Sequence, residues 1–138
     1  MANEHVLVLQ KSLPVSFTVA DGTGINKGTL LKMADPRTAS AATALNDIVA
    51  GISATEKIAS DGRVSVAVIQ GPGDEFTVKV CGNVTAGDPI GVSTGEGNNV
   101  RSIAAIPNLS PHKRLGWALN TVTNGQTLRY KLDMGGGA

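Results

Sequence analysis

Side chains that could support metal or nucleophilic chemistry are few in this sequence and far apart. His5, His112 and Cys81 supply all of its imidazole and thiol groups. A metal site needs several such ligands at short spacings, and these three show none. Cys81 has no adjacent histidine or helix start to stabilise a thiolate, so we interpret it as a small buried hydrophobe. A Cys81–His112 pair brought together by folding stays open without support from the spacing, and we predict no catalytic residue, metal or cofactor.

A glycine-rich segment and the aspartates are better explained by turns. Residues 22–28, Gly-Thr-Gly-Ile-Asn-Lys-Gly, superficially resemble a phosphate-binding loop. Such a loop must open a helix so that its amides meet the anion, whereas strand-like residues 29–33 follow here. The aspartates lie mostly beside Gly, Pro or Asn, where they close local backbone hydrogen bonds; they are Asp21, Asp35, Asp47, Asp61, Asp74 and Asp88. An acid–base pair is therefore not predicted.

One basic cluster and one tryptophan are candidates for contact with a partner. His112, Lys113 and Arg114 are consecutive, and Trp117 follows closely as the single Trp of the chain. The cluster is either a solvated loop or a patch that meets an acidic partner surface. Trp117 is either part of the core or an interface anchor, a role in which Trp is enriched.

Composition limits the class of protein. The chain has 138 residues and a net charge of +1, which fits one domain without a broad field for nucleic acid or anionic membranes. No apolar run approaches the roughly 20 residues of a membrane helix. A single cysteine excludes an intrachain disulfide. Residues 1–5 lack the basic start of a signal peptide, so we expect a soluble protein made in the cytoplasm.

The elements that position these residues are predicted to be all β. Short apolar runs alternate with turn signals, which favours a small barrel or sandwich of about ten strands. The predicted strands cover 6–9, 15–20, 29–33, 48–54, 63–70, 75–81, 89–93, 100–105, 115–121 and 127–133. The Ala-rich run 38–47 is open between helix and loop, with loop favoured. We predict that residues 15–134 form one β domain and that 135–138 form a flexible Gly-rich tail.

The domain is predicted to contain two similar halves, about 17–69 and 75–132. The phenylalanines Phe17 and Phe76 are separated by 76 − 17 = 59 residues, and the turn glycines 28 and 87 by 87 − 28 = 59. Later glycines, 51 and 116, are separated by 116 − 51 = 65, so the second half carries 6 more residues. We place these in the loop-like segments 95–99 or 107–111.

An N-terminal arm, residues 1–14, lies outside this repeat. It contains a strand-like run from Val6 to Leu9. An unmatched strand either closes the barrel of its own chain or adds to a neighbouring sheet edge. The sequence leaves both alternatives open.

Several of these short elements resemble those of tailed-phage capsid decoration proteins, also called cement proteins. The resembling segments are Asn26–Lys32, Val49–Ile52, Gly87–Ile90 and Leu115–Ala118, within about 15–133. The resemblance implies a compact β-barrel or β-tulip module, usually a trimer, on the outside of the expanded capsid. There it would bridge major capsid protein subunits at three-fold or quasi-three-fold sites, without catalytic residues.

This resemblance sets the expectations for partners and location. It implies a virion protein on the outer capsid surface, synthesised in the host cytoplasm and bound to the major capsid protein and to copies of itself, with no nucleic-acid, membrane or small-molecule partner. The expected interface residues are His5, Val6, Leu7, Val8, Leu9, Lys113, Arg114 and Trp117. The alternative function is a small trimeric β-fold hydrolase or ligand-binding module, with a polar pocket at a subunit boundary lined by residues such as Asp88 or Arg101.

Overall fold

The predicted all-β class is confirmed. The computed structural model describes residues 4–35, 37–44, 47–93, 98–106 and 113–133. Within these ranges the chain forms eleven strands and no α-helix, and so no helix that could cross a membrane. The strands are β1 (Val6–Leu9), β2 (Val15–Thr18), β3 (Leu30–Asp35), β4 (Thr38–Ala41), β5 (Val49–Ser53), β6 (Ser65–Ile69), β7 (Glu75–Lys79), β8 (Pro89–Val92), β9 (Val100–Ser102), β10 (Arg114–Ala118) and β11 (Thr127–Leu132).

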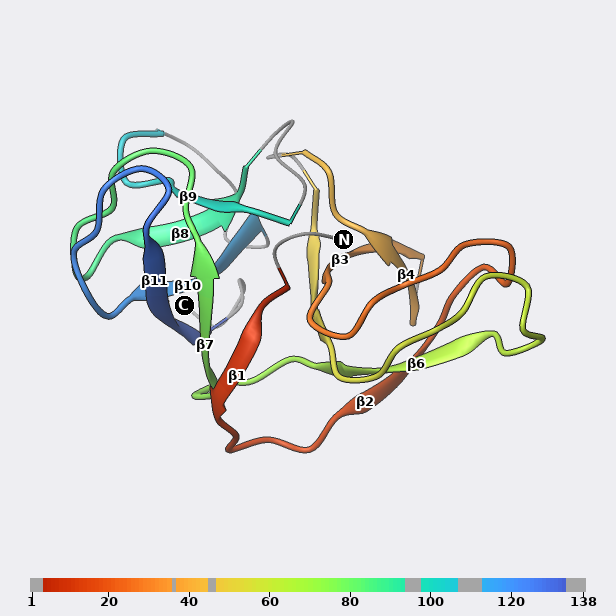
Figure 1. Cartoon of the computed structure of the whole chain (residues 1–138). Helices are drawn as coiled ribbons and strands as arrows, with labels where there is room; N and C mark the ends of the chain where they lie inside the picture. The colour runs from red at the N-terminus through yellow and green to blue at the C-terminus, as the bar shows by residue number, and fades with distance from the viewer. Residues whose placement is uncertain (1–3, 36, 45–46, 94–97, 107–112, 134–138) are drawn as a thin grey trace.

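The strands form two units that lie side by side (Figure 1). The first is a closed barrel in the order β2-β4-β3-β5-β6, and the second is a six-stranded sheet in the order β1-β7-β11-β10-β8-β9. In addition, a parallel bridge between Val80, just after β7, and Val100 of β9 connects β7 to β9. Without β1, the second unit therefore repeats the strand order of the barrel, as β7-β9-β8-β10-β11.

Isolated bridges outside the strands follow the same repeat. Ile25 bridges Lys57 in the first unit, and Val84 bridges Val122 in the second. The offsets are 84 − 25 = 59 and 122 − 57 = 65, the two values found in the sequence. The two units thus have matched bridges as well as a matched strand order.

The offset nevertheless varies from strand to strand. It is 102 − 41 = 61 between β4 and β9, so two extra residues precede β9 and four more separate β9 from β10. Between β6 and β11 the offset is 62, which places Phe17 in the position of Val78. The sequence-based pairing of Phe17 with Phe76 is therefore wrong by two residues, because both strands alternate in the same way and periodicity does not distinguish such a shift.

The run expected to be helix or loop begins with a strand. Residues Thr38–Ala41 form β4, which pairs antiparallel with β3 and parallel with β2 through Thr18 and Thr38. Ala39 is buried against the barrel interior. Both predicted alternatives are wrong for these residues because strand pairing in the closed barrel overrides the helix preference of Ala. Residues 45 and 46 of this run lie outside the described residues.

The two units share a core. Leu30, Val49, Ile52 and Ile69 of the barrel strands belong to the same buried cluster as the inner side chains of the second unit. A separate apolar cluster fills the barrel and consists of Phe17, Val19, Ile25, Leu31, Ala39, Ala50, Val66 and Val68. Burial of this apolar surface holds the units against each other.

The N-terminal segment is built into the same chain. Strand β1 pairs antiparallel with β7 at the edge of the six-stranded sheet, and Leu7 packs onto the core. Of the two alternatives for this strand, addition to a sheet edge is observed within the single chain. Farther along, the buried carboxylate of Asp74 accepts hydrogen bonds from the amides of Lys11 and Ser12, both at 3.0 Å, and from the Ser12 hydroxyl at 2.9 Å.

Candidate functional site: the outer face of the six-stranded sheet

His5 is a structural residue at the junction of the two units. It is 4% exposed, and its Nε2 donates to the carbonyl of Asn98 at 2.9 Å. Because that carbonyl only accepts, Nδ1 is the acceptor for the Tyr130 hydroxyl at 2.5 Å. The Asn98 side chain in turn accepts a hydrogen bond from the Leu30 amide at 2.6 Å and donates one to the Gly28 carbonyl at 2.9 Å. Burial lowers the pKa of His5 to about 4, against the smaller opposing effect of the Asn98 hydrogen bond, so the ring is neutral near pH 7.

Lys57 is the charged side chain most deeply placed in the barrel, and it too has a structural role. Its ammonium donates to the carbonyls of Asp21 and Ile58 and to the carboxylates of Asp21 and Asp61, at 2.8 to 3.1 Å. Burial alone would lower the pKa of Lys57, but its hydrogen bonds to Asp21 and Asp61 and their charges outweigh burial and raise it. The ammonium is therefore charged near pH 7, and its hydrogen bonds link the loop that contains Asp21 to the loop that contains Asp61.

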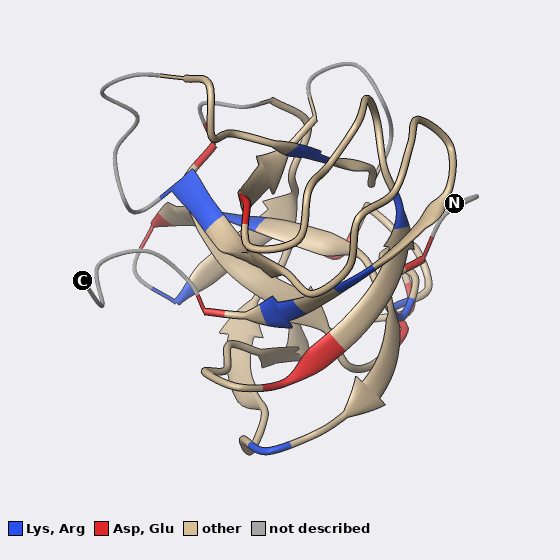
Figure 2. Cartoon of the chain, turned by 90° about the vertical axis from the view of Figure 1, so that its left-hand side faces the viewer, with Lys and Arg blue, Asp and Glu red and all other residues tan. Residues whose placement is uncertain are grey.

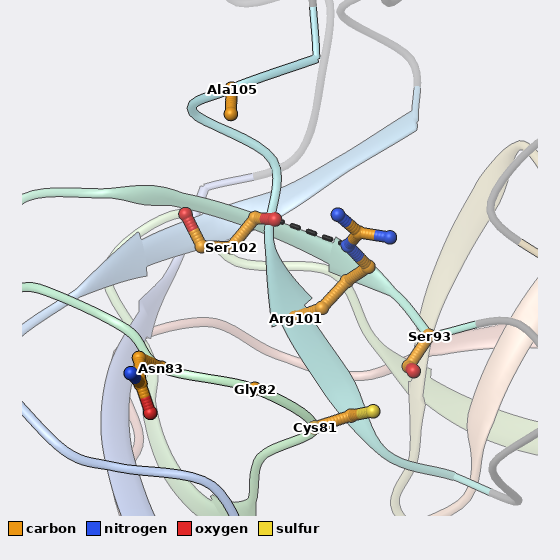
Figure 3. Close-up of a pocket in the computed structure, with 7 residues that line it drawn as sticks. All are labelled: Cys81, Gly82, Asn83, Ser93, Arg101, Ser102 and Ala105. Atoms are coloured by element: carbon orange, nitrogen blue, oxygen red, sulfur yellow. Dashed lines mark hydrogen bonds between the residues drawn. The ribbon is translucent and has the colours of Figure 1, made fainter.

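The polar pocket predicted by the alternative function exists in part (Figure 3). An open hollow of about 500 Å³ contains Arg101, and the other lining residues are Cys81, Gly82, Asn83, Ser93, Ser102 and Ala105. Arg101 Nε donates to the Ser102 carbonyl at 3.2 Å. Asp88 is not among the lining residues, but its carboxylate accepts a hydrogen bond from the hydroxyl of Ser102, which is. The distance is 2.9 Å.

This hollow does not assemble an acid–base pair from the described residues. Its described lining contains no carboxylate and no imidazole beside Cys81. His112 lies outside the described residues, and among the rest no three His, Cys, Asp or Glu side chains gather as a metal site. The part of the chain that the structure describes therefore offers a stronger candidate on its surface than in a cavity.

That candidate is the outer face of the six-stranded sheet, which looks toward the viewer in Figure 2. Alternation along β11 turns Leu128, Tyr130 and Leu132 into the core and exposes the residues between them. Cross-strand register then defines two outward rows. One row is Leu9, Glu75, Lys131, Trp117 and Pro89, and the other is Val6, Thr77, Arg129 and Leu119. We call these residues, with Lys79, Arg114 and Asp133, the outer face.

Trp117 is held rigidly near the middle of the outer face. Its indole nitrogen donates to Asp133 Oδ2 at 3.1 Å, and the Arg114 guanidinium lies 4.6 Å from the ring centroid. Arg114 Nε also donates to the Asp133 carbonyl at 3.2 Å. The register shifts between Arg114 and Gly116, which lets the side chains of Arg114 and Trp117 point to the same side of the sheet although they are three residues apart. Gly116 is needed there because a Cβ would lie 2.0 Å from the Lys131 carbonyl oxygen.

The outer face carries an excess of positive charge. Its basic residues are Lys79, Arg114, Arg129 and Lys131, and its acidic residues are Glu75 and Asp133, so its net charge is 4 − 2 = +2. Arg129 Nη2 and Nε lie 2.6 and 2.8 Å from Glu75 Oε1. In Figure 2, segments of Lys and Arg recur across the strands that face the viewer.

The structure brings only some of the expected interface residues together on this face. Val6 and Leu9 lie on it with Arg114 and Trp117, although they are distant in sequence. Val8 is exposed at the irregular step of β1, and Lys113 lies half-buried just before β10. Leu7 is partly buried against the core and His5 is buried, so neither belongs to the outer face.

Sequence reasoning missed much of the outer face. Neither Arg129 nor Lys131 is among the interface residues expected from the sequence, and neither is connected there with Trp117. The alternation Thr127-Arg129-Lys131 was the available signal. It shows which side chains share a side of one strand, but not which strand lies next to it.

Comparison with known proteins adds a fold relationship. No protein-family model matches the chain, and no curated protein matches it. Among solved structures, the chain is similar to the N base of the head fiber gp8.5 in bacteriophage phi29, with a TM-score of 0.53 and 20% sequence identity. The match covers 88% of this chain and 96% of the other. At this identity the likeness establishes a shared fold.

Proposed function

We propose that this chain is a structural virion protein that binds the outside of an expanded phage capsid. It bridges neighbouring major capsid protein subunits as a homotrimer at three-fold or quasi-three-fold sites, after synthesis in the host cytoplasm. The observation that carries the proposal is the fold shared along nearly the whole length of both chains with the base of a phage head fiber. The resemblance of its short β-elements to capsid decoration proteins points to the same class.

The chemistry of the described residues fits a binding role. The imidazole of His5 and the ammonium of Lys57 are engaged in structural hydrogen bonds, whereas basic, aromatic and apolar side chains share an exposed sheet face. A protein that binds only the mature lattice stabilises it by about 2.7 kcal/mol per site when free protein exceeds Kd a hundredfold. A trimer that contacts several subunits at once gains further from effective concentration, so each contact can be modest.

Binding to undecorated expanded shells tests this function. Purified chain is mixed with shells, and co-sedimentation and the temperature of shell disruption are measured. We expect saturable binding and a higher disruption temperature, together with a trimer mass in solution or a three-fold density on the shell. Full-length, folded chain that neither binds nor stabilises such shells would show that the proposal is wrong.

The N-terminal segment has to be tested by point substitution. Deletion of residues 1–12 would remove β1, the buried His5 and the partners of Asp74, so it would disrupt the fold as well as any contact. Val6→Ser is the better variant because Val6 is 58% exposed and faces outward. We expect the chain to fold normally and to bind shells more weakly.

A further inference from the structure

We propose that the outer face is the docking surface for the capsid and that it recognises an acidic protein surface with apolar patches. This inference rests on the proposed function and names the contact surface and the chemistry of the partner. It follows from three properties of the face: a preorganised aromatic centre, surrounding apolar side chains and an excess of positive charge.

The centre of the face is ready to bind without reordering. Trp117 is held by Asp133 on its indole nitrogen and covered in part by Arg114. A side chain that is already immobilised loses little conformational entropy on docking, and tryptophan and arginine are enriched at the residues that dominate binding energy. This pair therefore supplies the anchor.

Apolar side chains extend from this anchor across the sheet. Val6, Leu9 and Leu119 are 58%, 39% and 43% exposed and occupy the two outward rows of the face. Burial of such side chains contributes roughly 25 cal/mol for each Å² of apolar surface removed from water. A partner must therefore offer apolar surface as well as charge.

The charge of the face is unlike that of the rest of the chain. The whole chain has a net charge of +1 and the face +2, so all other residues together sum to −1. Lys131 lies on β11 opposite Trp117, and no ion pair or hydrogen bond of its ammonium occurs within the described residues. It is thus available for an acidic group of a partner. Two copies of this face would set like charges against each other, which argues against the face as a contact between identical copies.

A protein surface fits this face better than nucleic acid does. Glu75 and Asp133 compensate half of the basic charge on the face, because they pair with Arg129 and Arg114. Nucleic-acid affinity comes mainly from uncompensated basic groups that neutralise phosphates. The exposed aliphatic side chains would gain little from a phosphate backbone, whereas they would be buried against a protein.

The test uses one charge reversal on the face, one added charge beside the face, opposite Lys79, and one matched added charge on the barrel. Lys131→Glu reverses one charge at the centre, and Thr127→Glu adds one negative charge at the start of β11. The internal repeat supplies the control, because Ser65 occupies in β6 the position of Thr127 in β11, at the offset of 62, and is also exposed. Ser65→Glu therefore adds the same charge at the equivalent place on the barrel. Folding of each variant is checked by thermal unfolding before shells are added.

We expect Lys131→Glu to weaken binding to expanded shells by about tenfold or more, since reversing a charge in an electrostatically complementary contact costs at least about 1.4 kcal/mol. Thr127→Glu should weaken it less, and Ser65→Glu should leave it within about twofold of the unchanged chain. If folded Lys131→Glu binds like the unchanged chain, the assignment of the outer face as the docking surface is wrong while the proposed function stands. The same conclusion follows if Ser65→Glu weakens binding as much as Lys131→Glu does. If the unchanged chain fails to bind shells, the proposed function fails with it. Tight, salt-sensitive binding to duplex DNA in place of shells would also overturn the inference.

Discussion

Acidification should destabilise this protein through the buried, neutral His5. The folded chain keeps the His5 ring neutral between Tyr130 and Asn98, with its pKa lowered to about 4. In the unfolded chain the pKa returns to its ordinary value of 6.5. Between these values the unfolded state binds the proton and the folded state does not, so stability falls as the pH falls from 6.5 toward 4.

The size of the loss follows from the two pKa values. Between pH 7 and pH 5 the expected decrease in the free energy of unfolding is about 2 kcal/mol, and it approaches about 3 kcal/mol below pH 4. Asp61 does not interfere in the upper range. The backbone amide of Arg63, followed by Lys57, holds the pKa of its carboxyl below the ordinary value of 3.8, so its stabilising contribution is lost only below that pH.

Chemical denaturation at pH 7 and pH 5, at one protein concentration and ionic strength, measures this loss. The control is His5→Gln, which retains hydrogen-bonding groups but does not titrate. His112 lies outside the described residues, and it is present in both proteins, so its titration cancels. We expect the unchanged chain to lose about 2 kcal/mol more than His5→Gln between the two pH values. Equal losses in both would refute the assignment of His5 as the buried neutral group.

Two further substitutions, one of them with a matched control, test how the outer face and the N-terminal segment are held. Gly116→Ala should lower the free energy of unfolding by about 3 kcal/mol or more, because its Cβ would lie 2.0 Å from the Lys131 carbonyl oxygen. Gly22→Ala, with no atom within 4 Å of the added Cβ, should change it by less than about 0.5 kcal/mol, and similar effects in urea denaturation would contradict the close approach of the strands. Asp74→Ala should cost about 2 to 4 kcal/mol, because its carboxylate accepts three hydrogen bonds from the turn after β1. Faster hydrogen exchange of the Ser12 amide is the accompanying sign, and unchanged exchange would show that other contacts hold the turn.

The amino-acid sequence by itself determined the class of the fold and most of its strands. Alternation of apolar and polar side chains, as in Thr127–Leu132, is a local property, so it can be recognised without knowing which strand lies next to it. The turn glycines 28 and 87 likewise mark positions of positive φ, at 84° and 91°, which local backbone sterics reserve largely for glycine. These features indicated an all-β chain with two similar patterns of turns.

The tertiary structure alone decided what depends on contacts between distant residues. Thr38–Ala41 becomes a strand only because the barrel closes through it, and His5 becomes a buried neutral group only because Tyr130 and Asn98 surround it. The same holds for the outer face, where strand order places Val6, Arg129 and Trp117 on one surface. Pairing between strands far apart in sequence depends on the burial and hydrogen bonding of the whole chain, so no local sequence pattern determines it.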